Sequence, residues 1–175
     1  MSEQKETDKR DDVLQEKKVT NEEMLRYYQI LIGILHEGIS QLTGEVQDFM
    51  VRKHAEANVK VALEVLGRWS GRDPKTYDVD EMTKEYELIE KQYSNGGATI
   101  TREGNIITWK SNLSYCYDPK IEHGFIKPYP AYCDYCSKYF FEGLYGFAHK
   151  GPVKTEGLKG VLKGDNECLT RIELL

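Results

Sequence analysis

The sequence predicts an α+β fold: an N-terminal helical hairpin and a third helix, then two β-hairpins forming an antiparallel sheet, with a Cys-x-x-Cys helix inserted between them. Three observations predict it. Apolar residues recur at helical spacing as far as about residue 93, and over residues 98–110 and 153–174 they alternate at period two. A glycine-containing turn then divides each alternating region into two halves that can pair. We expect the helices to cover one side of the sheet.

Length and charge limit the number of domains and the classes of function that the chain can have. The 175 residues suffice for one well-buried α+β domain, which we place at residues 19–175, with helices over 19–95 and the sheet and cysteine helix over 98–175. Residues 1–18 are mostly charged and bury too little apolar surface to offset their chain entropy, so we expect a disordered tail. A net charge of −5 argues against nucleic-acid binding. No signal-peptide core is present, which favours a cytoplasmic protein.

The first two helices have clear start and stop signals. Thr20 or Asn21 can cap the first helix, whose apolar stripe runs over residues 24–42, and Gly44 is a suitable stop. The second helix spans about residues 45–70. Because so short a connection joins them, the two helices should form an antiparallel hairpin.

One segment of the first helix, residues 30–35, is apolar on nearly every side. It is far shorter than the roughly 20 residues that a membrane span needs. A single helix contact cannot cover such a surface, so we expect either a homodimer or a hairpin sandwiched by the sheet. The third helix, residues 79–93 with Asp78 as its cap, is more polar and ends at Asn95-Gly96-Gly97.

The strands follow. Residues 98–102 can pair with residues 105–110, and residues 153–162 with residues 167–174, each across a turn that contains glycine. The helix between these hairpins spans about residues 131–149. In the last strand, one face carries Cys168, Thr170, Ile172 and Leu174.

All four cysteines lie in the second half of the chain. Cys133 and Cys136 stand three residues apart on the predicted helix, so their sulfurs should share one face. Cys116, in a loop, and Cys168, on the last strand, can approach that face from the sheet. Four thiolates complete a tetrahedral zinc shell, so the sequence predicts a zinc site, with an iron–sulfur cluster less favoured.

Other interpretations of these residues stay open. Free cysteine is also a small, inert, buried residue. A thioredoxin-like role requires the Cys-x-x-Cys pair at a helix N-terminus directly after a strand, whereas a long loop precedes it here. Asp165 suits a turn better than a general base. His123 and His149 flank the cysteine helix and could replace Cys116 or carry protons. His36 and His54 are assigned no role.

Aromatic residues are concentrated around the cysteine helix. They could line a pocket for a ring-containing ligand, and ordinary core packing is the alternative. Gly143 and Gly146 weaken the helix by roughly 1 kcal/mol each relative to alanine, which indicates close approach of a backbone or a ligand. The predicted pocket residues are Trp109, Tyr132, Tyr139, Phe140 and Tyr145.

Residues 105–175 resemble the 4-vinyl-reductase-type small-molecule-binding domain, in particular the branch related to L-2-amino-thiazoline-4-carboxylate hydrolases. Three segments carry the resemblance: Cys133-Asp134-Tyr135-Cys136, the aromatic helix over residues 139–147, and Gly164-Asp165-Asn166-Glu167-Cys168 before the last strand. Cys116 after an extended segment also resembles the hydrolase branch. The resemblance implies an α+β domain that binds a small, often apolar ligand and frequently forms dimers.

These observations lead to three hypotheses of function. The first is a protein that binds a hydrocarbon-like or aromatic small molecule beside a cysteine-ligated metal. The second is an amidine or thiazoline ring hydrolase, in which a thiolate or metal-bound water attacks a cyclic C–N bond. The third is an assembly or chaperone-like partner of a larger enzyme. Motifs of nucleotide hydrolases, dinucleotide enzymes and common peptidases are absent from the sequence.

Overall fold

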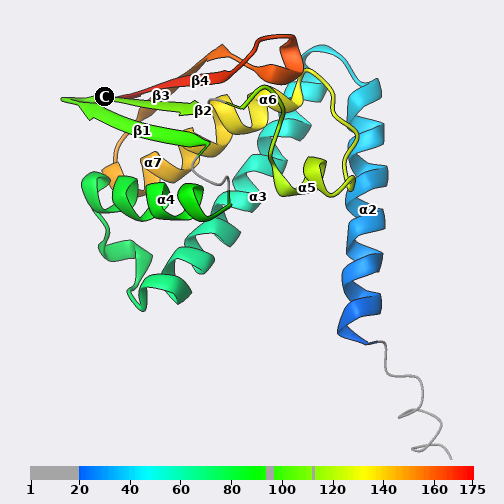
Figure 1. Cartoon of the computed structure of the whole chain (residues 1–175), viewed down its shortest axis with the longest axis horizontal. Helices are drawn as coiled ribbons and strands as arrows, with labels where there is room; N and C mark the ends of the chain where they lie inside the picture. The colour runs from blue at the N-terminus through cyan, green and yellow to red at the C-terminus, as the bar shows by residue number, and fades with distance from the viewer. Residues whose placement is uncertain (1–19, 94–96, 112) are drawn as a thin grey trace, which may run out of the picture.

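The computed structural model describes residues 20–93, 97–111 and 113–175, except the side chains of Asn21, Gln92, Tyr93 and Cys136. The predicted tail (residues 1–18) and Asn95-Gly96 of the predicted break lie outside these residues. The helices come first and a four-stranded antiparallel sheet follows, so the predicted α+β class is confirmed (Figure 1). The main elements are α2 (Asn21–Gln41), α3 (Gly44–Ser70), α4 (Val79–Tyr93), β1 (Ala98–Glu103), β2 (Ile106–Ser111), α5 (Pro119–Glu122), α6 (Tyr132–Asp134), η2 (Tyr135–Phe140), α7 (Phe141–His149), β3 (Val153–Lys159) and β4 (Cys168–Leu174).

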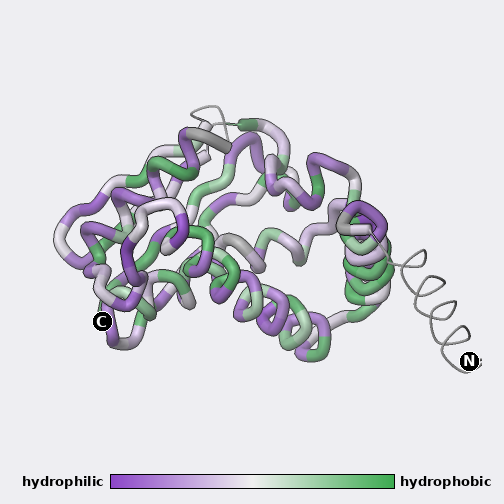
Figure 2. The backbone as a smooth tube through the Cα atoms, turned by 90° about the horizontal axis from the view of Figure 1, so that it is seen from below, coloured by the Kyte–Doolittle hydropathy of each residue, from purple (hydrophilic) through white to green (hydrophobic). Residues whose placement is uncertain are grey.

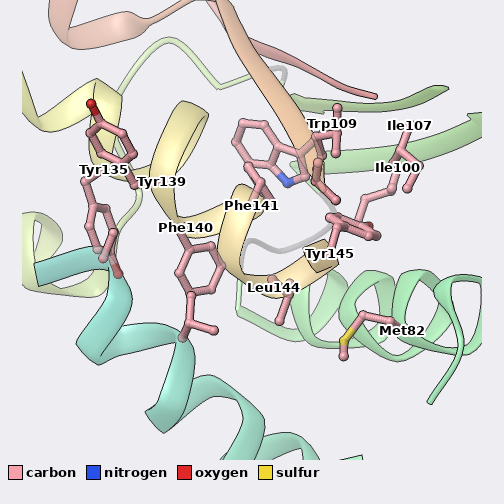
Figure 3. Packing of buried hydrophobic residues seen from close by; sticks show 14 of the residues in the cluster. Met82, Ile100, Ile107, Trp109, Tyr135, Tyr139, Phe140, Phe141, Leu144 and Tyr145 are labelled. Atoms are coloured by element: carbon pink, nitrogen blue, oxygen red, sulfur yellow. The ribbon is translucent and has the colours of Figure 1, made fainter. Parts of the chain in front are cut away.

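The sheet has the strand order β1-β2-β4-β3, so the two hairpins meet along β2 and β4. Trp109 lies opposite Thr170, and Ile107 lies opposite Ile172. These four side chains are buried, and their neighbours along each strand are more exposed. The helices pack against this one face, where Phe141, Leu144 and Tyr145 of α7 fill the space between the strands and Met82 of α4 (Figure 3).

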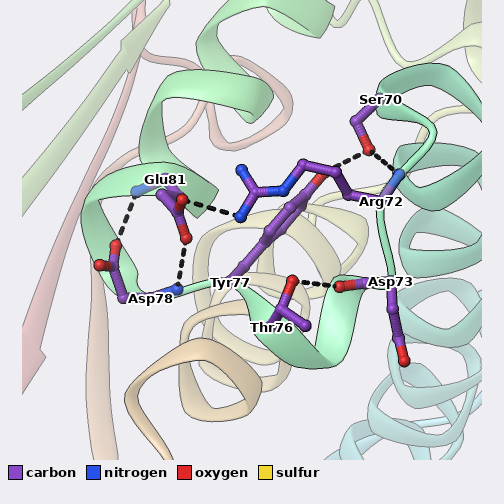
Figure 4. A network of polar contacts seen from close by, with 7 residues as sticks. All are labelled: Ser70, Arg72, Asp73, Thr76, Tyr77, Asp78 and Glu81. Carbon is purple, nitrogen blue, oxygen red and sulfur yellow. Dashed lines mark hydrogen bonds and ion pairs between the residues drawn. The ribbon is translucent and has the colours of Figure 1, made fainter.

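The connection between α3 and α4 is fixed by polar contacts (Figure 4). The Tyr77 hydroxyl donates to Ser70 Oγ at 2.5 Å, at the end of α3. Arg72 lies over the Tyr77 ring at 4.8 Å and pairs with Glu81 at 2.8 Å. Asp78 accepts the Glu81 backbone N–H at 2.9 Å, so it caps α4 as predicted.

The second hairpin differs from its prediction. Strand β3 ends at Lys159, and a 3-10 turn, η3 (Val161–Lys163), replaces the predicted last residues of the strand. The Asp165 carboxylate accepts the Gly160 N–H at 2.8 Å, which closes the loop. Asp165 therefore stabilises this loop, which is the structural role that was weighed against a general base.

The cysteine segment is not the single α-helix predicted for residues 131–149. It is divided into α6, the π-helical segment η2 and α7. Ser137 Oγ donates to the Cys133 carbonyl at 2.6 Å, and Thr155 Oγ1 donates to the Lys138 carbonyl at 2.5 Å, so side chains bond two helix carbonyls. In a π-helical turn residues five apart share a face, and the rings of Tyr135 and Phe140 lie 5.9 Å apart.

Gly143 marks a close approach between helices. A Cβ atom on Gly143 would lie 2.8 Å from Val59 Cγ2, so α7 packs directly on α3. A Cβ atom on Gly146 would lie 3.9 Å from the Gly151 carbonyl oxygen, which is an ordinary contact distance. The close approach predicted from these glycines therefore holds for Gly143 alone, and its partner is a side chain of α3.

The predicted helical hairpin is open. Helix α2 contacts α3 near their junction, where the rings of His36 and His54 lie 4.4 Å apart, and then diverges from it (Figure 1). The inner face of α2 instead packs on the loop before the cysteine helix: a Cβ atom on Gly33 would lie 2.8 Å from the Phe125 carbonyl oxygen. Gly44 has a φ of +62° and begins α3, whereas the prediction placed it as the stop of the first helix.

Several apolar residues of α2 remain exposed. Figure 2 shows hydrophobic positions along this helix. Ile34 is 62% exposed, whereas Ile32 is partly buried against the core. No helix in the described part of the chain is long and apolar enough to cross a membrane. The exposed apolar residues of α2 are Met24, Leu25, Tyr27, Tyr28, Ile30, Leu31, Ile34 and Leu35, and we refer to them as the α2 stripe.

Candidate functional site

A cavity of about 230 Å³ lies between the core face of the sheet and the helices. Its walls come from β2 and β4, from α4, from residues 115–119, from the α6–η2 segment, and from residues 159–162 at the end of β3. Most of these walls are aromatic or aliphatic, with thiols and a few polar groups between them. Segments that are far apart in the sequence therefore form the walls of this one cavity.

Three of the five predicted pocket residues, Trp109, Tyr132 and Phe140, line this cavity. Tyr139 and Tyr145 do not. An α-helix would place Tyr139 on the same face as Tyr135, but the π-helical segment puts Phe140 there instead. The pattern of residues on the helix faces thus shifts by one position after Tyr135.

Tyr139 and Tyr145 have structural contacts. The Tyr139 hydroxyl donates to the Asp48 carboxylate, and the Arg52 guanidinium lies over its ring at 4.3 Å, so Tyr139 ties η2 to α3. Tyr145 is buried between α7 and α4, where Thr83 Oγ1 donates to its hydroxyl at 3.4 Å. Burial raises the pKa of Tyr145 to about 12.

Two buried polar atoms belong to side chains in the cavity wall. Trp109 is 5% exposed and Thr170 is fully buried. Within the described residues, neither Trp109 Nε1 nor Thr170 Oγ1 has a hydrogen-bond partner. Both residues line the cavity and face each other across β2 and β4. Since buried polar groups are nearly always satisfied, this pair indicates a partner in the cavity, such as a ligand or ordered water.

Glu90 also lines the cavity, and sequence reasoning missed it. It is 7% exposed, and the Tyr117 hydroxyl donates to Glu90 Oε2 at 2.5 Å, with Tyr86 as a second donor. Burial raises the pKa of the Glu90 carboxyl, and the nearby Asp118 charge adds to this, while the two tyrosine hydroxyls lower it. One sequence signal was available: Glu90 continues the four-residue spacing of Met82 and Tyr86.

Three predicted metal ligands, Cys116, Cys133 and Cys168, come together along the cavity wall. Each sulfur accepts a backbone N–H. Val161 donates to Cys168 Sγ at 3.5 Å, Leu162 donates to Cys133, and Asp118 donates to Cys116. Consecutive amides of the η3 turn thus hold two sulfurs. The side chain of the fourth predicted ligand, Cys136, lies outside the described part.

The position of the Cys133 sulfur also explains why residue 160 is a glycine. A Cβ atom on Gly160 would lie 2.7 Å from Cys133 Sγ, so only glycine lets the loop approach the sulfur this closely. The η3 turn, α6 and β4 therefore meet around two sulfurs without a side chain between them.

Burial is the main influence on these thiols. It raises the pKa of Cys116 to about 12, with smaller increases from the nearby Asp118, Cys168 and Cys133. Burial likewise raises the pKa values of Cys133 and Cys168. The three groups are therefore neutral thiols near pH 7 unless a cation stabilises their thiolate forms.

The donor chemistry of this cluster suits a soft metal ion, because thiolates with backbone N–H donors are typical ligands of zinc. The geometry is less complete. Among side chains within the described ranges, no group of three or more His, Cys, Asp or Glu residues is arranged to hold a metal ion. His123 and His149, the predicted alternatives, are not among the residues that line the cavity.

The two histidines that were assigned no role contact each other beside this region, with His36 buried and His54 half-buried. His36 Nδ1 lies 2.8 Å from the Tyr129 hydroxyl, and its ring contacts Tyr132 in the cavity wall. Burial lowers the pKa of His36 to about 4 and that of His54 to about 3. Their spacing along two different helices gave no local signal of this contact.

No protein-family model and no curated protein matches the chain.

Proposed function

We propose that this protein binds a small, ring-containing, largely apolar molecule in the cavity between the sheet and the helices. The observation that carries the proposal is the pair of buried polar atoms, Trp109 Nε1 and Thr170 Oγ1, which have no partner among the described residues and belong to side chains in the cavity wall. A ligand with a hydrogen-bond acceptor would satisfy the indole N–H. The resemblance to vinyl-reductase-type domains points to the same function.

The size of the cavity limits the ligand. An engineered apolar cavity of about 150 Å³ holds benzene, and pockets for drug-sized molecules begin at about 300 Å³. At about 230 Å³, this cavity suits a single substituted ring. Its aromatic and aliphatic walls favour an apolar ring body, while the few polar groups would set its orientation.

Benzyl alcohol is a suitable probe, because it has one ring and a hydroxyl that can accept from Trp109 and exchange a hydrogen bond with Thr170. Calorimetric titration should show one site per chain. Val161→Trp places a large side chain in the cavity wall and should abolish binding. The control, Leu158→Trp, adds the same side chain at an exposed position on the same hairpin and should bind normally. Binding that persists in Val161→Trp would contradict the proposal.

We also propose that Cys116, Cys133, Cys136 and Cys168 hold zinc beside this cavity, with an iron–sulfur cluster less favoured. The supporting observation is that three of these sulfurs border one space and accept backbone N–H groups. Such contacts stabilise thiolates more than thiols, and an adjacent cation would lower the thiol pKa values. A bound metal would tie helix, loop and strand together.

The hydrolase hypothesis requires an activated thiolate or a metal-bound water. Burial raises the pKa of each described thiol, which disfavours a thiolate nucleophile. If all four cysteines instead bind zinc, none remains as a nucleophile and the metal has no open position. We therefore favour ligand binding over turnover.

A third proposal concerns assembly: the α2 stripe forms a homodimer contact. Four of its members, Met24, Tyr28, Leu31 and Leu35, follow the alternating spacing of four and three residues that is typical of a coiled-coil seam. All four are exposed. An exposed apolar seam of this length is more consistent with an interface than with a solvated surface.

A further inference from the structure

The cavity is not uniformly apolar, and its charged residues have different surroundings. Lys159 pairs with Glu167 at 2.5 Å, and Asp118 pairs with Lys120 at 3.1 Å. Glu90 lies on α4, where it is 7% exposed and held by tyrosine hydroxyls. The phenol hydroxyls hold the carboxyl group in place, so that it borders the cavity within a largely aromatic wall.

Aromatic rings surround this part of the cavity. Tyr117, which donates to Glu90, stacks with Trp109 at a centroid distance of 6.3 Å and an interplanar angle of 30°. The ring centroids of Phe141 and Trp109 are 5.4 Å apart. Figure 3 shows these two side chains beside each other. Phe141 also meets Tyr86 at a right angle, with 5.9 Å between centroids. The faces of aromatic rings are electron-rich and attract cations. A buried carboxyl among such rings is therefore suited to a positive charge.

We propose that the α4 end of the cavity binds the cationic nitrogen of a small organic ligand, an ammonium or amidinium group attached to a ring, with Glu90 as its counter-ion. The inference rests on the proposed function, because it names the chemical class of ligand for the same cavity. Trp109 and Thr170 lie on neighbouring strands in the same wall and would take the ligand's hydrogen-bond acceptor.

The spacing of residues along β4 supports a ligand that contains a single ring. Thr170 and Cys168 are two residues apart on one face of β4, a separation of about 7 Å. The part of the cavity beside Thr170 and Trp109 is thus about one ring length from Cys168.

Charge also decides which ligands are excluded. The Asp118 charge raises the pKa of Glu90, so the two carboxyl groups act on the same region, but Lys120 pairs with Asp118 and offsets its charge. An anionic ligand beside Glu90 would bring two negative charges together in a poorly solvated space, where repulsion is stronger than in water. A cation at the same place is attracted by the Glu90 carboxylate.

Three probes with the same ring separate these possibilities: benzylamine, which is protonated at pH 7, benzyl alcohol and benzoate. In calorimetric titrations of the full chain, benzylamine should bind roughly tenfold or more tightly than benzyl alcohol, since hydrogen bonds to charged groups are the stronger ones. Benzoate should bind most weakly. If benzyl alcohol or benzoate binds as tightly as benzylamine, the cation inference is overturned, although the proposed cavity function stands.

Glu90→Gln should remove the preference for benzylamine over benzyl alcohol. The matched control is Glu87→Gln, which makes the same charge change on α4 at a residue that pairs with Lys91 on the surface. A preference that survives Glu90→Gln would overturn Glu90 as the counter-ion.

Should Glu90→Gln fail to fold, Tyr117→Phe provides a second test. It removes one donor from the Glu90 carboxylate and should reduce the preference for benzylamine while benzyl alcohol still binds. An unchanged preference counts against the inference. If none of the three probes binds the parent protein, both the cavity function and the cation inference are contradicted.

Discussion

Trp109 and Thr170 lie directly opposite each other on β2 and β4, and each has a buried polar atom without a hydrogen-bond partner in the described structure. An unsatisfied buried donor or hydroxyl typically costs about 1–3 kcal/mol. Two such atoms in the wall of one cavity suggest that part of the stability of the fold is exchanged for ligand recognition. The proposed function depends on this relationship.

Thr170→Val tests whether the Thr170 hydroxyl is unpaired in the free protein and used in ligand binding. The substitution should have opposite effects on stability and on binding. Valine has nearly the same shape and removes the unsatisfied hydroxyl, so the ligand-free protein should gain up to about 1 kcal/mol in the free energy of unfolding. Affinity for benzyl alcohol should fall. Thr108→Val, on the opposite face of the sheet, controls for the change in strand preference. Urea unfolding and calorimetry measure both quantities, and a loss of stability in Thr170→Val would count against an unpaired hydroxyl.

The metal proposal is tested by Cys116→Ser. If Cys116 is a ligand, the variant should lose bound metal and melt at a lower temperature, because a structural zinc can contribute on the order of 10 kcal/mol of binding free energy to folding. If Cys116 is instead a nucleophile, metal content and melting should be unchanged and thiazoline ring opening should be lost.

Elemental analysis and a visible spectrum of anaerobically purified protein provide the measurement, and they also separate zinc from an iron–sulfur cluster. The metal proposal fails if no metal copurifies and all four thiols titrate freely in the native protein.

Acid should destabilise the protein through the histidine pair. The pKa values of His36 and His54 are lowered from 6.5 to about 4 and about 3. Between pH 6.5 and each lowered pKa, the unfolded chain therefore binds more protons than the folded chain. Stability contributed by the pair is complete above about pH 6.5 and is lost as the pH falls, with a slope of at most about 1.4 kcal/mol per pH unit for each histidine.

Denaturant unfolding between pH 4.5 and 7.5 measures this slope. His54→Gln should reduce it by about half, whereas His123→Gln, at an exposed position, should leave it unchanged. Equal slopes in the parent protein and in His54→Gln would show that other groups cause the acid sensitivity.

The assembly proposal predicts different effects for substitutions at two nearby residues of α2. Ile34 is 62% exposed and Ile32 packs partly against the core. Ile34→Lys should therefore dissociate the dimer and leave the chain folded, while Ile32→Lys should lower the stability of the chain itself. Light scattering after size-exclusion chromatography and circular dichroism measure the two effects. A parent protein that is monomeric at all concentrations would rule out the dimer.

Much of the fold could be predicted from local signals. Asp78 and Glu81 set the start of α4, and the alternation on both sides of Gly104 gives the first hairpin. The last strand buries Thr170, Ile172 and Leu174 on one face, as its period-two pattern predicts. In each of these cases, residues close in sequence determine the structure.

The remaining features depend on contacts between distant segments. The π-helical turn, which exchanges Tyr139 for Phe140 in the cavity wall, is accompanied by a bond from Thr155 on β3 to the Lys138 carbonyl. A glutamate on α4 is expected at the surface, whereas in the structure Tyr117 from a distant loop donates a hydrogen bond to Glu90. Helix α2 packs on the loop at Phe125, far from it in the sequence. The spacing of Met82, Tyr86 and Glu90 places Glu90 on the buried face of α4, but no local pattern predicts the contacts between these distant segments.

The most direct measurement of the central claim is the pair of indole N–H resonances in the NMR spectrum. Trp109 is buried in the cavity wall, and Trp69 on α3 is 48% exposed and is not among the residues that line the cavity. A Trp69→Phe variant assigns the two signals. On titration with benzyl alcohol, we expect the Trp109 signal to move downfield as its N–H gains an acceptor, while the Trp69 signal stays in place. If the Trp109 signal does not move, or if both signals move together, the cavity is not the binding site.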